Sequence, residues 1–255
     1  MIDYSAVDGL VPVWKDGVLW LTLDRPTTRN AMTVAMRQGL ITAMREADSN
    51  PETRLVVITG TDPAFSSGVD LKEWLGVGGG TKVDPAAMIR AARTPVLGVI
   101  NGLCYTGGLE VALSCSFLIA SDRARFADTH AKVGLLPGWG MTALLPRAVG
   151  ARLATQMMAT GEPIGAEQAL NTGLVNEVVP HDQLLERARA IAAMLCAANP
   201  RSIEIQLGLI ADGEGTSLAH ALSAAADAKL RWRDDTTDVG ARFARRHDSP
   251  SATSN

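Results

Sequence analysis

The chain has 255 residues, of which 47% are hydrophobic, 20% charged and 4% aromatic, and its formal net charge is −3. These proportions are typical of a soluble globular protein, and a chain of this length buries enough surface to fold without a metal or disulfide staple. The near-neutral charge balance, with no long run of one sign, argues against nucleic acid and membrane surfaces as partners.

The N-terminal sequence and the cysteines indicate the compartment. MIDYSAVDGL lacks the order of basic, apolar and small residues that marks a secretory signal, and no stretch approaches the length of a membrane span. Cys104, Cys115 and Cys196 are widely spaced and form no C-x-x-C pair. The sequence therefore predicts free thiols, no metal site and a location in the cytoplasm.

The first half of the chain alternates strand-like and helical patterns. Residues 33–47 repeat apolar side chains at spacings of three and four, which predicts an amphipathic helix. A shorter helical pattern begins near Gly107, after a glycine-rich turn. Short apolar runs predict buried strands at 18–23, 55–59, 96–100 and 117–121. This order predicts a mixed α/β layered fold.

After Gly150 helical patterns dominate. One strand-like piece interrupts them at 174–179, and the Ala-rich stretch 219–230 has small side chains that permit close approach of helices, within a subunit or between subunits. Further helices are predicted at 181–197, 200–212 and 216–233. Beyond Arg246 the tail is short and polar. The predicted organisation is a core over 1–195, a helical region over 196–246 and a disordered tail over 247–255.

The segment GVGGGTK, residues 76–82, superficially resembles a phosphate-binding loop. A dinucleotide fingerprint needs a third Gly where Thr81 stands, and a Walker loop needs Lys directly after its last Gly, followed by Ser or Thr. Neither template is met. The segment is interpreted as a surface loop, and a loop beside a substrate entrance would have the same composition.

Two other glycine-containing turns directly follow predicted strands. Gly68 allows a sharp turn that leaves the N–H of Val69 pointing outward, and Gly107 opens a helix whose first N–H groups have no partner in that helix. Glu110 lies three residues later, on the same face of the first turn. Each feature alone is a common stabilising device. Together they form a candidate oxyanion hole with a nearby carboxylate.

Four segments carry a family resemblance. They are LDRPTTRNAM at 23–32, AFSSGVDLKEW at 64–74, NGLCYTGGLEVALSCSFLIAS at 101–121 and RFADTHAKVGLLPGWG at 125–140. In this order and spacing they resemble the motifs of the enoyl-CoA hydratase/isomerase family, also called the crotonase superfamily. The resemblance spans about residues 10–235. It implies a spiral of β-β-α units with a helical C-terminal trimerisation region, assembled as a homotrimer or a dimer of trimers.

The resemblance also implies a ligand and site residues. The substrate would be an acyl-CoA thioester, in which coenzyme A is part of the substrate and no separate cofactor is needed. Val69 and Gly107 would supply the oxyanion-hole N–H groups, and Glu110 would orient or deprotonate water. The coenzyme A moiety would be bordered by Arg29, Asn30, Ala31, Ser67, Val69, Asp70 and Leu71. Arg25 and Lys72 are either phosphate partners or solvated surface charges. Trp139 and Thr106 would shape the acyl pocket.

The sequence departs from the family pattern at His130, where hydratases of the family place a second Glu. An imidazolium can also donate a proton near neutral pH. The difference in shape matters, because a displacement of about 1 Å can cost on the order of 100-fold in rate. His130 is therefore either a functional residue or a merely packed histidine, and Asp128 is a nearby carboxylate that could substitute.

Three functional hypotheses follow. The first is hydration of 2-trans-enoyl-CoA to 3-hydroxyacyl-CoA. The second is another reaction through the same thioester enolate, such as isomerisation, dehydration or C–C cleavage. The third is a non-catalytic acyl-CoA-binding protein that has lost turnover, motivated by His130.

Overall fold

The computed structural model describes residues 7–76, 83–232 and 239–243. They form two compact units, one up to Glu204 and one from Ile205 onward. The predicted disordered tail, 247–255, and residues 77–82 of the glycine-rich segment lie outside the described residues. The three-part division of the chain stays a prediction.

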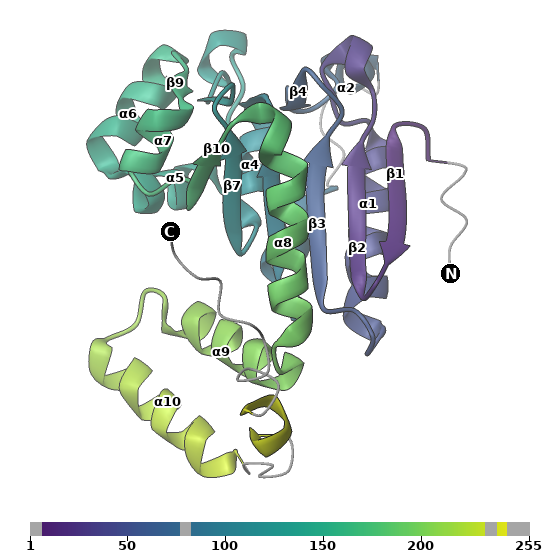
Figure 1. The fold of residues 1–255 in the computed structure, drawn as a ribbon. Helices are drawn as coiled ribbons and strands as arrows, with labels where there is room; N and C mark the ends of the chain where they lie inside the picture. Colours follow the sequence, from purple (N-terminus) through teal and green to yellow (C-terminus); the bar gives the residue numbers. More distant parts are fainter. Residues whose placement is uncertain (1–6, 77–82, 233–238, 244–255) are drawn as a thin grey trace, which may run out of the picture. The chain divides into compact units, whose positions relative to one another are not determined.

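A six-stranded sheet forms the centre of the first unit, in the order β1-β2-β3-β5-β7-β10 (Figure 1). β1 pairs with β2 antiparallel, and all the other neighbours are parallel. The strands are β1 Leu10–Lys15, β2 Val18–Leu23, β3 Leu55–Gly60, β5 Val96–Ile100, β7 Phe117–Ser121 and β10 Glu177–Val179. The predicted strands in the first half are confirmed. The strand expected at 174–179 is limited to its last three residues.

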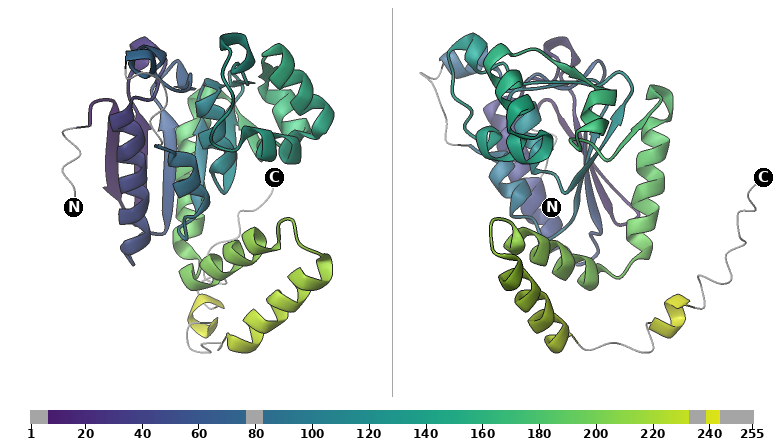
Figure 2. Two further views of the ribbon diagram at one scale, coloured as in Figure 1. Left: turned by 180° about the vertical axis from the view of Figure 1, so that it is seen from behind. Right: turned by 90° about the vertical axis from the view of Figure 1, so that its left-hand side faces the viewer.

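Helices cover both faces of this sheet, α1 (Val34–Ser49) on one and α8 (Leu184–Ala197) on the other (Figures 1 and 2). Because side chains of a strand alternate between faces, β3 contributes to two cores. Val56 and Ile58 belong to the cluster that includes residues of α1, whereas Leu55 and Val57 belong to the cluster with residues of α8. Burial on both faces explains why these strands are continuous apolar runs.

A second, smaller sheet has the order β4-β6-β8-β9. Its strands are β4 Ala64–Ser66, β6 Leu103–Tyr105, β8 Arg125–Ala127 and β9 Ile164–Gly165. β4, β6 and β8 follow the long strands β3, β5 and β7 in turn, so successive β-β units wind into a spiral. The predicted crotonase-like spiral is confirmed. These short strands were not predicted, because two or three residues carry no periodic pattern.

The remaining helices lie between the strands and after the last strand along the chain. They are α2 Leu71–Gly76, α3 Pro85–Arg90, α4 Gly107–Ser114, α5 Met141–Val149, α6 Ala151–Thr160, α7 Ala166–Asn171, α9 Pro200–Gly213 and α10 Leu218–Arg231. Single 3-10 turns are η2 Pro26–Thr28, η3 Ala131–Val133 and η4 His181–Gln183. The predicted helices of the C-terminal half are confirmed to within three residues at each end. None of the helices described here combines the length and the apolar character needed to cross a bilayer.

Candidate active site

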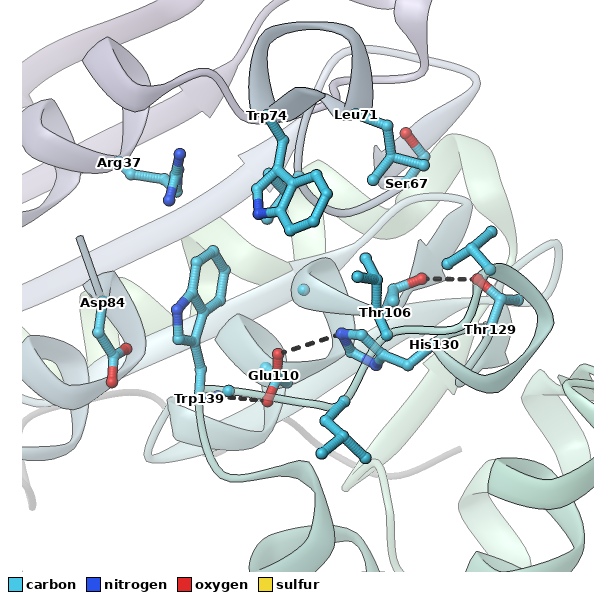
Figure 3. Close-up of a pocket in the computed structure, with 16 residues that line it drawn as sticks. Arg37, Ser67, Leu71, Trp74, Asp84, Thr106, Glu110, Thr129, His130 and Trp139 are labelled. Carbon is cyan, nitrogen blue, oxygen red and sulfur yellow. Dashed lines mark hydrogen bonds and ion pairs between the residues drawn. The ribbon is translucent and has the colours of Figure 1, made fainter. Parts of the chain in front are cut away.

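A pocket of about 490 Å³ opens where the short strands β4 and β6 lead into helices α2 and α4 (Figure 3). Much of the site predicted from the sequence lines it: Ser67, Val69, Leu71, Gly107, Glu110, His130 and Trp139. These residues come from segments that are far apart in the chain. The parallel register of β4, β6 and β8 brings the ends of these strands to one edge of the small sheet.

The two glycine turns lie directly against each other. Gly68 has a φ of +108°, which is unfavourable for other residues, and a Cβ placed on it would lie 3.2 Å from the backbone nitrogen of Gly107. Among the described residues, no acceptor takes up the N–H of Val69 or that of Gly107. A Cβ on Gly108 would lie 2.5 Å from the carbonyl oxygen of Ser66, so α4 begins in close contact with β4.

Thr106 precedes α4 in a conformation that is rare for its type. Its φ is +54° and its ψ is −118°, and a β-branched residue at positive φ is strained by about 1–3 kcal/mol. The Oγ1 atoms of Thr106 and Thr129 are 2.9 Å apart and share a hydrogen bond, and both residues line the pocket. Thr106 therefore adds a hydroxyl and a methyl group to the pocket wall beside Gly107.

Glu110 lies in the first turn of α4 and is 2% exposed. Its Oε1 accepts hydrogen bonds from the backbone N–H of Trp139, at 2.6 Å, and of Met141, at 3.2 Å. Burial raises the pKa of the Glu110 carboxyl above its ordinary value, although these two hydrogen bonds and the nearby His130 act in the opposite direction. The carboxyl group is thus held by one oxygen, and Oε2 remains directed toward His130 (Figure 3).

His130 is held from behind by Asp128. The Nδ1 atom of His130 is 2.6 Å from Oδ1 of Asp128, which also accepts the backbone N–H of His130 at 3.0 Å. A carboxylate accepts the proton on Nδ1, which fixes the ring orientation and directs Nε2 outward. Nε2 lies 3.8 Å from Oε2 of Glu110. Asp128 is 1% exposed and holds the imidazole, whereas the sequence suggested that its carboxylate could substitute for the second Glu.

The other side of the pocket is aromatic and was only partly predicted. Trp74 of α2 and Trp139 both line it, and Arg37 of α1 lies with its guanidinium 5.7 Å from the centre of the Trp139 ring. Sequence reasoning missed Trp74 and Arg37. Trp74 ends the quoted segment AFSSGVDLKEW, but Arg37 lies within an ordinary amphipathic helix pattern and carries no signal of its own.

Several residues expected to border coenzyme A instead make internal contacts. The Asn30 amide donates to the carbonyls of Thr61 and Ala64 and accepts from the N–H of Arg25. Arg25 Nη1 lies 2.7 Å from the carbonyl of Ala31 and 2.9 Å from Oδ2 of Asp70. These bonds secure the loop that pairs with the Gly68 turn, where the N–H of Met32 donates to Gly68.

Asp70 is the charged partner in this network. Burial opposes its ionisation, but hydrogen bonds from Arg25 and from the N–H groups of Glu73 and Lys72 dominate and lower the pKa of the Asp70 carboxyl. Arg29 and Lys72 are exposed, and of the predicted cationic residues they are the more available to an external phosphate. Their contact with coenzyme A, like that of the other predicted border residues, stays a prediction.

The winding of short and long strands into two sheets, with a pocket at their ends, is the architecture of the crotonase class of α/β proteins. Residues 14–228 match the family model described as enoyl-CoA hydratase/isomerase, and the chain belongs to this family.

Individual relatives agree with this assignment. A probable peroxisomal enoyl-CoA hydratase 1 of Arabidopsis thaliana is 35% identical, over 87% of this chain and 86% of that protein. The crystal structure of an enoyl-CoA hydratase from Mycobacterium tuberculosis H37Rv has a TM-score of 0.76 at 42% identity, covering 88% of this chain and 98% of that one. A probable enoyl-CoA hydratase/isomerase from Mycobacterium abscessus has a TM-score of 0.84 at 30% identity, with 92% and 95% covered.

Proposed function

We propose that the protein is an enoyl-CoA hydratase, a hydro-lyase that adds water reversibly to a 2-trans-enoyl-CoA to give a 3-hydroxyacyl-CoA. The observation that carries the proposal is the placement of Glu110 Oε2 and His130 Nε2, 3.8 Å apart, in the pocket that the Val69 and Gly107 turns also line. The two atoms lie within ion-pair distance, but 3.8 Å exceeds a hydrogen-bond distance, so each keeps hydrogen-bonding capacity. Both are free to act on substrate. The relatives named enoyl-CoA hydratase support the same reaction.

The proposed reaction begins with the thioester carbonyl at the N–H groups of Val69 and Gly107. Ionised Glu110 takes a proton from water as the water oxygen bonds to C3, and the C2=C3 electrons move toward the carbonyl. The enolate oxygen gains charge where the two donors lie, an interaction whose loss costs about 100- to 1000-fold in rate. His130, as the imidazolium, then donates its Nε2 proton to C2.

The catalytic cycle is completed when a proton passes from Glu110 back to His130. After the addition Glu110 is protonated and His130 is neutral, so transfer of one proton from Oε2 to Nε2 restores both groups. The raised pKa of the Glu110 carboxyl makes it a stronger base than an ordinary glutamate. The carboxylate of Asp128 holds the Nδ1 side of the ring, so that Nε2 faces the substrate. This arrangement favours a proton-transfer role for His130 over passive packing.

Turnover with crotonyl-CoA and longer 2-trans-enoyl-CoAs tests the proposal. We expect loss of the conjugated enoyl absorbance and formation of 3-hydroxyacyl-CoA, and a decrease of at least about 100-fold in kcat for Glu110→Gln and His130→Ala. If the wild type binds acyl-CoA tightly but shows no turnover, the hydratase proposal is overturned and the hypothesis of an acyl-CoA-binding protein is supported. A different product from the same thioesters would support another reaction through the enolate.

The proposal extends to assembly, cofactors and location. A homotrimer or dimer of trimers is supported by α10, on which Leu218, Leu222 and Leu230 are exposed in the single chain. Within the described residues no cluster of three or more His, Cys, Asp or Glu could hold a metal ion. The independence from cofactors and the location in the cytoplasm stay predictions.

A further inference from the structure

Arg37 is a buried cation in the candidate site that the proposed reaction does not use. It lies on α1, is 3% exposed and lines the pocket. Its Nε and Nη1 atoms each lie 3.3 Å from a backbone carbonyl oxygen, that of Thr33 and that of Val83 respectively. Both acceptors are neutral, so they satisfy hydrogen bonds without balancing the charge.

No carboxylate of the described residues lies within ion-pair distance of the Arg37 guanidinium. The sequence of residues 77–82, next to Val83, contains neither Asp nor Glu. Burial lowers the pKa of Arg37, against the raising effect of Glu73. An arginine nevertheless stays charged, and a buried charge without a counterion is unfavourable. The free hydrogen-bonding capacity of the guanidinium is therefore suited to an anion.

Neighbouring acidic groups are engaged elsewhere. Asp84 also lines the pocket, but its Oδ1 accepts the N–H of Ala87 at the start of α3 and its Oδ2 lies 3.9 Å from Arg90. Glu73 Oε2 accepts the N–H of Val34, at 2.7 Å, at the start of α1. Each carboxylate thus has a partner other than Arg37.

Trp139 connects this cation to the reacting groups. Its backbone N–H binds Glu110, and its ring atom Cζ3 would lie 3.0 Å from a Cβ on Gly107, while the Arg37 guanidinium lies 5.7 Å from the ring centre. In Figure 3, Arg37 lies on the opposite side of the pocket from Thr106 and Thr129, beyond the indoles of Trp74 and Trp139. An acyl chain that leaves the oxyanion hole along the indoles therefore runs toward Arg37.

We propose that Arg37 binds a carboxylate at the far end of the acyl group, so that the preferred substrates are enoyl-CoA thioesters with a distal carboxylate. This inference rests on the proposed function for the direction in which the acyl chain lies. The desolvation of the guanidinium has already occurred on folding, so a carboxylate gains charge-assisted hydrogen bonds at a preformed partner. The indoles enclose the apolar part of the same chain.

Paired substrates test the proposal. For 2-trans-enoyl-CoAs of equal chain length, ending in a methyl or a carboxylate group, we expect the wild type to have the higher kcat/KM with the carboxylate. Arg37→Met should lower kcat/KM for the acid by about 10- to 100-fold more than for the methyl substrate. Arg37→Lys, which retains the charge, should keep part of the preference. Arg45→Met, an exposed position on the same helix, is the matched control.

Equilibrium binding separates this inference from the hydratase proposal. Saturated acyl-CoAs with and without a distal carboxylate can be titrated calorimetrically even if no turnover occurs. Tighter binding of the acid, lost in Arg37→Met, supports the Arg37 site independently of catalysis. A wild type that favours the methyl ligand at every chain length would overturn the proposal. An equal loss for both ligands in folded Arg37→Met or Arg37→Lys would also overturn it, because Arg37 would then contact the shared coenzyme A moiety.

Discussion

Burial and hydrogen bonding act in opposite directions on the pKa of the Glu110 carboxyl. Burial disfavours its charged form, and the N–H groups of Trp139 and Met141 favour it, with burial dominating so that the pKa is raised. Oε1 is held by the two N–H groups, and Oε2 faces His130. The position of the Glu110 carboxyl thus depends on a loop around Trp139, 29 residues away along the chain.

Stability measurements on Glu110→Gln test this balance. A carboxyl whose pKa is raised on folding binds its proton more tightly in the folded state, so its contribution to stability is lost as pH rises from the unfolded pKa through the folded one. We expect the Tm difference, Glu110→Gln minus wild type, to increase with pH across that interval and then level off. Thermal melts from pH 4 to 8 check this, with exposed Glu52→Gln following the wild type. A pH-independent difference would contradict it.

Asp128 illustrates a residue that acts through another. Its carboxylate holds Nδ1 of His130 at 2.6 Å and does not itself line the pocket. In Asp128→Asn the imidazolium loses its charged partner. We expect kcat to fall by about 10- to 100-fold with little change in KM, because the imidazole ring is no longer held by a carboxylate. Asp122→Asn, an exposed aspartate, is the control. An unchanged kcat in the folded variant would show that Asp128 does not act on the reaction through His130.

At the scale of elements, the candidate oxyanion hole depends on how closely α4 approaches β4. The parallel strands β4 and β6 end side by side, and the absence of a side chain at Gly108 lets α4 begin against Ser66. The loop before α1, secured by Asn30, pairs with the turn at Gly68 from the other side. Strand β4, helix α4 and the loop before α1 thus determine the positions of the Val69 and Gly107 N–H groups.

Gly108→Ala tests this packing. The new Cβ would lie 2.5 Å from the carbonyl oxygen of Ser66, which is backbone and cannot move by rotation of a side chain. We expect a destabilisation of about 1–3 kcal/mol and a fall in kcat of at least tenfold, because α4 must shift away from β4. Denaturant unfolding and steady-state kinetics measure both. Gly208→Ala, in an open helical position, should keep full activity. Wild-type kinetics in Gly108→Ala would contradict the argument.

At the scale of the whole molecule, the chain leaves apolar surface uncovered when it is alone. Leu218, Leu222 and Leu230 lie on α10 at spacings of four and eight, so they share one face of the helix, and each is more than 60% exposed. Large apolar side chains exposed along one helix are typical of interfaces between subunits.

Molar mass by light scattering tests self-association. We expect the wild type to have the mass of a trimer or hexamer, and Leu222→Glu to shift the population toward smaller species, because a carboxylate is costly to bury in an apolar interface. Leu185→Glu on α8, also exposed, serves as a control for added charge. A wild type that is monomeric at micromolar concentration would contradict the predicted assembly.

The long strands and the family could be predicted from the sequence. Apolar runs predicted the buried strands. The motifs around Gly68, Gly107 and Glu110 identified the family, because the local chain geometry requires those residue types at those positions. The short strands β4, β6 and β8 were not predictable, since three residues have no period. The sequence could not predict that Arg37 and Trp74 line the pocket or that Asp128 holds His130. These placements depend on contacts between distant segments or on the direction of a side chain. Local pattern therefore determined the elements and the family, while only tertiary packing decided which side chains meet, because burial and charge pairing are properties of the assembled fold.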